Sequence, residues 1–404
     1  MYLTRLSLTN FRLFSRLDVD VPRRVLLLIG SNAQGKTSLL EAIYYLATFT
    51  SFHAQNDRQL VNFIASREKL SVARLVALYQ KEDRPHRLEV RLIQESNGNG
   101  GSRLRKEVLL DGVKISPAQI IGEFSAVIFL PQMTGILEDG PEERRRYLNL
   151  AISQAQPVYT QALSEYTQAL TQRNALLKLL SEHGGDPSQL DYWDDILVSR
   201  GAILIASRAE AIQELEALAK RIHEKLTGAT EVLRLLYHPS YDPLPAPEGQ
   251  FALPIQVQVQ RNGLTIEKIK QGFLAQLKQI RQEEIARGVT TIGPHRDEMR
   301  VLCNGIDLTD YGSRGQIRTA LLSLKLAEVE WLKAKTGQCP VLLLDETLAE
   351  LDTDRRKYLL DYLDTVEQAI LTTTDMNLFP ADFREKCERW QVESGKITRL
   401  TQGE

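Results

Sequence analysis

The chain has 404 residues, which is long for a single hydrophobic core and favours two domains or lobes. It is 43% hydrophobic and 25% charged, as in soluble globular proteins, and its net charge of −2 excludes a uniformly basic surface for nucleic acid. Three cysteines without metal-ligand spacing favour buried thiols in a reducing compartment. The sequence shows neither a membrane-length apolar run nor a signal peptide, so we expect a cytoplasmic protein without a membrane partner.

The first 140 residues predict β-structure around one helix, because apolar and polar residues alternate through much of this region. We expect strands at 1–8, 24–30, 71–80, 86–94, 104–110 and 125–131, and a helix at 36–48. Gly-rich and polar stretches at 95–102 and 111–114 predict turns between neighbouring strands.

The middle of the chain predicts helices. Residues from Pro141 to about Glu182 and from Leu190 to Leu226 have a helical pattern, and the stretch HGGDPSQ separates them. Two long helices joined by a short breaker predict an antiparallel pair. A loop follows at 238–249, and strand, helix and strand signals then lead to Asp310. The remainder of the chain alternates helix and strand, as in a parallel sheet.

These patterns together predict an α/β fold in which one domain is built from both ends of the chain. We assign residues 1–140 and 290–404 to this domain. Residues 141–289 then form an inserted, mainly helical lobe that contains the helical hairpin. No internal repeat is evident.

The stretch GSNAQGKT fits the phosphate-loop pattern G-x-x-x-x-G-K-[ST], follows an apolar strand and opens a helix, which is the context that the motif requires. The residues whose backbone N–H groups can surround the phosphates of ATP are Gly30, Ser31, Asn32, Ala33, Gln34, Gly35, Lys36 and Thr37. Lys36 is expected to reach the β- and γ-phosphates, and the Thr37 hydroxyl to ligate Mg²⁺. A chance glycine-rich turn is a poor alternative, because the motif and both flanks agree.

A buried strand that ends in acids should complete a site of this kind, and VLLLDE supplies one. Asp345 stands at the end of the strand and is expected to hold Mg²⁺ through water. Glu346 can orient or deprotonate the attacking water and is the expected catalytic base. An ordinary strand that ends in solvated acids is the alternative. Asp352 follows at the next helix start, where capping and a functional role are equally compatible with the sequence.

The stretch YGSRGQ opens a helix whose apolar residues recur at helical spacing from Ile317 to Trp331. Its polar start carries Ser313, Gly315 and Gln316, and the first N–H groups and the serine hydroxyl can bind phosphate oxygens there. On these residues alone, capping of the helix by Ser313 is the simpler interpretation.

The order of phosphate loop, Ser-x-Gly-Gln helix and acidic strand resembles that of ABC ATPases. In that class the signature helix caps the γ-phosphate of ATP held by a second copy. The resemblance therefore implies an ATP-dependent homodimer, with Ser313 acting on the partner's nucleotide. The large insert argues against a transporter motor subunit, and short helical arms without heptads argue against an SMC-type structural tether, which are the two alternatives.

Stretches along nearly the whole chain, among them NFRLF, IFLPQ, EDGPEERRRYLNLAI and TIGPHRDEM, resemble the RecF family of SMC-like ABC ATPases. The resemblance implies binding to double-stranded DNA at gaps and junctions, slow ATP hydrolysis, and action with RecR and RecO in loading the RecA recombinase. It implies roles in gap repair, at stalled replication and in the SOS response. It also places Asn10 and Arg12 near the nucleotide and makes Gln132 a reporter of nucleotide state. A strand end with surface charge, and a plain turn, are the alternatives for these residues.

Several positions depart from the family pattern. Glu346 stands where a second Asp is common, and Asn149 where an Asp is usual. The segment around His53 lacks the usual Ser/Thr-Arg pair, so family roles there are not transferred. Thr374 and Asp375 occupy the position of the ABC switch histidine, which makes base chemistry at that position doubtful.

Duplex DNA binding would need clustered cations that face phosphates. The candidates are Arg103, Arg105, Lys106, Arg144, Arg145 and Arg146. For the last three, a solvated and self-paired helix end is the alternative. His295 and Arg296 are interpreted as part of a turn with a satisfied histidine.

Overall fold

The computed structural model describes residues 1–97, 101–244 and 264–400. The chain divides into two compact units, Met1–Met133 with Glu328–Glu404, and Thr134–Ala327. The predicted α/β fold, with one unit built from both chain ends, is confirmed. The division assigns residues 290–327 to the second unit, whereas the sequence interpretation placed them with the chain ends.

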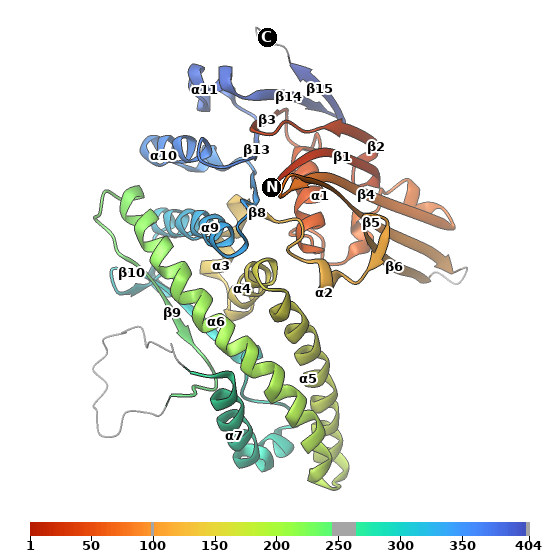
Figure 1. Cartoon of the computed structure of the whole chain (residues 1–404), viewed down its shortest axis with the longest axis vertical. Helices are drawn as coiled ribbons and strands as arrows, with labels where there is room; N and C mark the ends of the chain where they lie inside the picture. The colour runs from red at the N-terminus through yellow and green to blue at the C-terminus, as the bar shows by residue number, and fades with distance from the viewer. Residues whose placement is uncertain (98–100, 245–263, 401–404) are drawn as a thin grey trace. The chain divides into compact units, whose positions relative to one another are not determined.

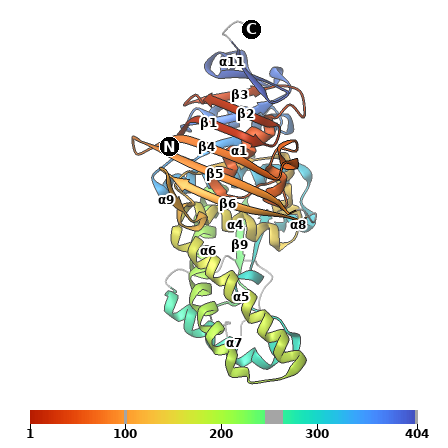
Figure 2. The same cartoon turned by 90° about the vertical axis from the view of Figure 1, so that its right-hand side faces the viewer.

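An antiparallel sheet of strand order β2-β1-β4-β5-β6-β7 forms one layer of the first unit (Figure 2). Its strands are β1 (Tyr2–Phe11), β2 (Phe14–Asp20), β4 (Leu70–Lys81), β5 (Arg84–Asn97), β6 (Gly101–Leu110) and β7 (Val113–Ile115), and α2 (Pro117–Ile120) follows. Leu3, Leu6, Leu8 and Phe11 of β1 are buried, as expected for a sheet with one face in the core, and a register shift between Leu3 and Arg5 interrupts the alternation. The middle of the turn expected at 95–102 lies outside the described residues.

A second sheet of order β15-β14-β3-β13-β12-β8 is parallel except for its terminal β14–β15 hairpin. Its strands are β3 (Val25–Ile29), β8 (Ala126–Phe129), β12 (Val341–Leu344), β13 (Ala369–Thr373), β14 (Glu388–Glu393) and β15 (Lys396–Leu400). The associated helices are α10 (Thr353–Leu363) and α11 (Ala381–Lys386). The central strands are continuous apolar runs, because parallel strands are buried on both faces.

Helix α1 (Lys36–Thr48) packs against strands of both sheets (Figure 1). Every residue of this helix except Thr37 and Ser38 is buried. Its apolar side chains join the core cluster that includes Leu6 of β1 and Leu28 of β3. The phosphate loop is therefore followed directly by a helix that is packed between strands of the two sheets.

The second unit is mainly helical. Its helices are α3 (Gly135–Glu138), α4 (Pro141–Ala155), α5 (Pro157–His183), α6 (Leu190–Leu226), α7 (Ile266–Arg287) and α8 (Leu308–Tyr311), and α9 (Arg314–Thr336) runs on into the first unit. Its strands β9 (Leu233–His238), β10 (Glu298–Cys303) and β11 (Ile306–Asp307) form a small antiparallel sheet. Figures 1 and 2 show α5 and α6 side by side, with α7 against them.

The single helix expected from Pro141 to Glu182 is two helices, so that prediction is wrong in one respect. Gln156 adopts an extended conformation between α4 and α5. Proline disfavours helical geometry in the residue before it, and Pro157 follows Gln156. The second expected helix has the predicted bounds, Leu190–Leu226.

Buried charge pairs join the helices of the second unit. Arg173 of α5 contacts Asp194 of α6 at 2.6 Å and Glu284 of α7 at 2.7 Å, and all three side chains are inaccessible to solvent. Removing one partner from such a set leaves a buried charge uncompensated, which costs about 3–5 kcal/mol. The three helices are therefore coupled by charge as well as by apolar packing.

The strand expected between the 238–249 loop and α7 lies outside the described residues, as does the end of that loop. All three cysteines are free and buried. Among the helices in the described parts of the chain, none combines the length and apolarity needed to cross a membrane.

Candidate nucleotide site and signature helix

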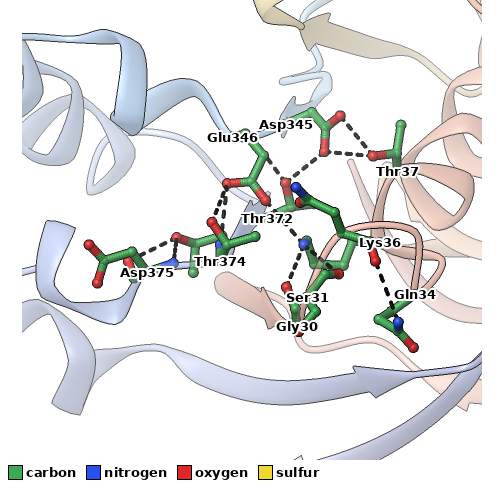
Figure 3. Close-up of polar contacts among 12 residues, drawn as sticks. Gly30, Ser31, Gln34, Lys36, Thr37, Asp345, Glu346, Thr372, Thr374 and Asp375 are labelled. Carbon is green, nitrogen blue, oxygen red and sulfur yellow. Dashed lines mark hydrogen bonds and ion pairs between the residues drawn. The ribbon is translucent and has the colours of Figure 1, made fainter.

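The phosphate loop runs from the end of β3 into α1 (Figure 3). Gly35 directly precedes α1 with φ 112°, a conformation that favours glycine. A Cβ built on Gly30 would lie 2.3 Å from the carbonyl oxygen of Val392, so the backbone of β14 excludes any larger residue. Ser31, Asn32 and Ala33 are exposed at the tip of the loop, where a triphosphate can approach their backbone.

The Lys36 ammonium lies inside this loop. Nζ donates to the carbonyl oxygens of Gly30 at 2.5 Å and Ser31 at 3.2 Å, and the Lys36 side chain is only 4% exposed. Nζ is also 3.1 Å from Oε1 of Glu346. The loop lysine and the second strand-end acid therefore lie in direct contact.

The two acids after β12 have different partners. The Thr37 hydroxyl donates to Asp345, at 2.9 Å from Oδ2 and 3.1 Å from Oδ1. Thr372 of β13 donates to Asp345 Oδ1 at 2.6 Å, and its hydroxyl oxygen accepts from the Glu346 N–H at 2.9 Å. The Thr37 hydroxyl and the Asp345 carboxylate form a hard-oxygen pair that fits Mg²⁺. Sequence reasoning missed Thr372, because a threonine inside a β-strand carries no functional signal.

Glu346 is held in an unusual backbone conformation, with φ 48°. Its Oε2 accepts from the Thr374 N–H at 3.2 Å, with the Thr374 hydroxyl at 3.5 Å. Its Oε1 is buried and accepts no hydrogen bond. A residue at the switch-histidine position thus orients the carboxylate (Figure 3), and one carboxylate oxygen keeps the capacity to accept a proton.

The phosphate loop is also braced by the β14–β15 hairpin. The N–H of Ser394 donates to Gln34 Oε1 at 2.7 Å, and the N–H of Gly395 donates to the Gln34 carbonyl at 3.0 Å. This contact joins residues 360 positions apart in the chain. It has no local sequence signal.

Asn10 and Arg12 support the site's scaffold. Arg12 makes a bidentate pair with Glu41 of α1, with both contacts at 2.7 Å, and donates to the Gln59 carbonyl at 3.0 Å. The Asn10 amide donates to the Val72 carbonyl at 3.2 Å. Gln132 is exposed in a short 3₁₀ helix after β8.

The start of α9 has the geometry of a capping box. The Gln316 N–H donates to the Ser313 hydroxyl and the Ser313 N–H donates to Gln316 Oε1, both at 3.2 Å. Ser313, Arg314 and Gly315 are exposed, and a Cβ on Gly315 would meet no atom within 4 Å. Capping by Ser313 and an open surface for a ligand therefore coexist at this helix start.

The basic candidates for DNA contact fall into two groups. Arg103 and Arg105 are exposed on β6, while Lys106 pairs with Asp57 at 2.7 Å. Arg144 is buried and makes a bidentate ion pair with Glu298. This structural ion pair differs from the DNA contact that was expected of Arg144.

The neighbours of Arg144 differ from it in exposure. Arg145 donates to the Asp297 carbonyl at 2.8 Å, whereas Arg146 is exposed with Glu143 3.8 Å away. A buried, paired arginine cannot neutralise a phosphate without breaking its pair. Arg103, Arg105 and Arg146 are therefore the accessible members of the predicted set.

A parallel sheet with a phosphate loop, a strand-end Asp–Glu pair and a separate signature helix defines the class of ABC-type ATPase heads. The family model of the RecF/RecN/SMC N-terminal domain matches residues 2–395. Proteins named DNA replication and repair protein RecF from Roseiflexus castenholzii and Chloroflexus aggregans are 38% and 39% identical to the chain, and each alignment covers 98% of this chain and 99% of the relative. The chain belongs to the RecF family.

Solved structures agree with this assignment. The structure of a recombination mediator protein RecF with ATP, described as part of the RecFOR pathway, is 29% identical with a TM-score of 0.82, over 99% of this chain and 98% of that one. An SMC head bound to the winged-helix domain of ScpA is 14% identical with a TM-score of 0.52, which shows the shared fold alone. The predicted resemblance to SMC-like ABC ATPases is confirmed.

Proposed function

We propose that the chain is an ATP-switched DNA clamp of recombinational repair. Two copies join face to face when ATP is bound, close over duplex DNA at gaps or junctions, and separate after slow hydrolysis. The observation that carries the proposal is the nucleotide site of the first unit, in which Lys36, Asp345 and Glu346 converge at the end of a parallel sheet.

The chain's own residues account for nucleotide binding and hydrolysis. The loop amides and Lys36 bind the triphosphate, whose negative charge competes with Glu346 for the ammonium. Mg²⁺, held by Thr37 and Asp345, would neutralise charge on the β- and γ-phosphate oxygens. Glu346, oriented by Thr374 and released from Lys36, accepts a proton from the attacking water through Oε1.

Slow turnover follows from a site that a second copy must complete. The exposed Ser313 and the open approach to Gly315 suit an acceptor surface for the partner's γ-phosphate. Hydrolysis then acts as a timer on the dimer. The relation of the chain to RecR- and RecO-type partners in loading a recombinase is part of this proposal, supported by the RecFOR context of its structural relative.

The test is the mass of the Glu346→Gln protein in solution with ATP, since slow turnover should accumulate the dimer. Adding Ser313→Arg is expected to give monomer, because a bulky cation blocks the signature surface. Adding Ser181→Arg, at an exposed serine of α5, is the matched control and should leave the dimer intact. A dimer that survives Ser313→Arg contradicts the composite site.

DNA binding is tested with labelled duplex, single-stranded and gapped DNA, with and without ATP, over a range of salt. Affinity should rise with ATP and fall with salt, because cations that contact phosphates release counterions. Equal affinity in every nucleotide state contradicts the switch, and a salt-independent affinity contradicts phosphate contacts.

A further inference from the structure

A group of possible metal ligands lies in the second unit, apart from the residues of the phosphate loop. It comprises His223 near the end of α6, Glu231 in the loop before β9, and Cys303 at the end of β10. One ligand atom from each lies within 4.8 Å of the others. His223 and Cys303 are buried, and the Glu231 side chain is 21% exposed, so a cation can reach the group from solvent.

Both ring nitrogens of His223 have polar neighbours, and one arrangement of protons leaves Nε2 available to a metal. The Ser323 hydroxyl donates its one proton to the Thr319 carbonyl at 2.8 Å. When the serine proton stays on that carbonyl, the contact between Ser323 Oγ and His223 Nδ1 at 3.0 Å requires the proton on Nδ1. In a neutral ring, Nε2 then presents a lone pair.

That lone pair faces another acceptor. Nε2 of His223 is 3.2 Å from Oε2 of Glu231, and the Cys303 sulfur is within hydrogen-bonding reach of the same carboxylate. With the ring proton on Nδ1, this contact needs a shared proton or a cation between Nε2 and the carboxylate oxygen. A second ring proton, a protonated Glu231 carboxyl and a bound cation each meet this need, and only the cation also uses the neighbouring Cys303 sulfur as a ligand.

We propose that His223 Nε2, Glu231 Oε2 and Cys303 Sγ bind a zinc-class divalent cation. Imidazole, thiolate and carboxylate are the donors that Zn²⁺ takes, whereas Mg²⁺ and Ca²⁺ prefer oxygen alone. Zinc–ligand distances of about 2.0–2.3 Å require the three atoms to move together by only about an ångström. Ser323 supports the site as a positioning residue, because its hydroxyl oxygen can accept from the Nδ1–H of a ring whose Nε2 binds the metal.

The site is linked to the signature helix by hydrogen bonds. The Gln316 amide donates to Glu231 Oε1 at 3.0 Å and lies 3.9 Å from the Cys303 sulfur. The other end of the same amide accepts from the Ser313 N–H. A cation on Glu231 and Cys303 therefore fixes Gln316, and through it the start of α9. The effect of this link on dimerisation rests on the proposed function.

The first test measures binding of Co²⁺, which occupies zinc sites. Co²⁺ bound to a thiolate has a charge-transfer absorption that Co²⁺ bound only to oxygen ligands lacks. The full-length protein is stripped with a chelator and titrated with Co²⁺ and then with Zn²⁺. We expect one Co²⁺ per chain with this absorption, and its displacement by Zn²⁺. Cys303→Ser should abolish the absorption, and Cys387→Ser, at another buried cysteine, should retain it.

Two gentler variants guard against misfolding. Glu231→Gln, at a partly exposed side chain, should weaken Zn²⁺ binding at least tenfold, and Ser323→Ala should weaken it about 10–100-fold. Absence of the charge-transfer absorption in the wild-type protein, or its persistence in Cys303→Ser, overturns the proposal. A His223 ring that is doubly protonated at neutral pH in protein saturated with Zn²⁺ also overturns it.

The link to the signature helix is tested separately with the Glu346→Gln protein and ATP. Removal of the bound metal should lower the dimer fraction several-fold, and Zn²⁺ should restore it. An unchanged dimer fraction overturns the link. Absence of a dimer in both metal states counts against the proposed function, while the Co²⁺ titration still decides the metal site.

Discussion

At the scale of single residues, Asp345 and Glu346 are adjacent in the chain but have different partners. Asp345 accepts from the hydroxyls of Thr37 and Thr372, a hydroxyl-rich setting that suits a metal ligand. Glu346 accepts from the Thr374 N–H through Oε2, and its Oε1 is ion-paired with the Lys36 ammonium. This difference in surroundings supports the proposed roles, metal binding for the first acid and proton transfer for the second.

The role of Glu346 predicts the behaviour of Glu346→Gln. The amide cannot accept a proton, so ATP turnover should fall by about 100-fold or more. ATP binding should persist, because the loop amides and Lys36 remain. Steady-state phosphate release and equilibrium ATP binding check the two expectations, and Glu350→Gln is the control acid. Wild-type turnover in Glu346→Gln would exclude it as the base.

Thr372 predicts a second result. Thr372→Val keeps the side-chain shape but removes the donor to Asp345 and the acceptor of the Glu346 N–H, so it should destabilise the protein by about 1–3 kcal/mol. Thr372→Ser keeps the hydroxyl and should have a much smaller effect. Thermal unfolding and Mg²⁺-dependent ATP affinity measure both variants. Equal effects of valine and serine would show that the hydroxyl is not needed.

At the scale of elements, the sequence predicts what local signals define. The phosphate loop, α1 and α6 follow the expected bounds, because strong motifs and long periodic patterns mark them. Pro157 marks the break before α5 in the sequence. The single-helix prediction overlooked it because apolar periodicity continues on both sides of the proline. The contact of Gln34 with the β14–β15 hairpin was unpredictable, because it depends on the register of two distant strands.

The close approach at Gly30 predicts the effect of Gly30→Ala. The new methyl group would lie 2.3 Å from the Val392 carbonyl oxygen, so β14 or the phosphate loop must move. ATP affinity should fall more than tenfold, because the loop amides must lie within about half an ångström of their productive positions. Gly112→Ala probes strain alone, since its Cβ meets no atom although its φ is 85°. Titration with a fluorescent nucleotide measures the ATP affinity of both variants. An unchanged affinity in Gly30→Ala would show that the close contact between Gly30 and β14 does not position the phosphate loop.

At the scale of the whole molecule, we expect stability to depend on pH through a partly buried histidine of the second unit, His295. His295 Nδ1 accepts from the Tyr166 hydroxyl at 2.7 Å, and Nε2 donates to the Thr290 carbonyl at 3.2 Å, which satisfies the neutral ring. Burial lowers the pKa of His295 to about 4. The satisfied histidine expected from the sequence is observed.

This lowered pKa fixes the sign of the pH effect. Between about pH 6.5 and about pH 4 the unfolded state binds the proton and the folded state does not, so stability is present above 6.5 and is lost as pH falls. Glu89 and Asp18, with pKa values of about 2, add to this loss only at lower pH. Urea unfolding across this window should show a decline that is smaller in His295→Gln. A stability that rises on acidification would contradict the assignment.

The order of strands in the parallel sheet has a consequence for synthesis on the ribosome. β3 carries the phosphate loop and is made early, yet both of its sheet neighbours, β13 and β14, come from the last part of the chain. The nascent polypeptide therefore cannot pair β3 with either neighbour, or bring Thr372 to Asp345, until these later strands have been synthesised. A product cut short before β13 would leave both edges of β3 without a partner strand.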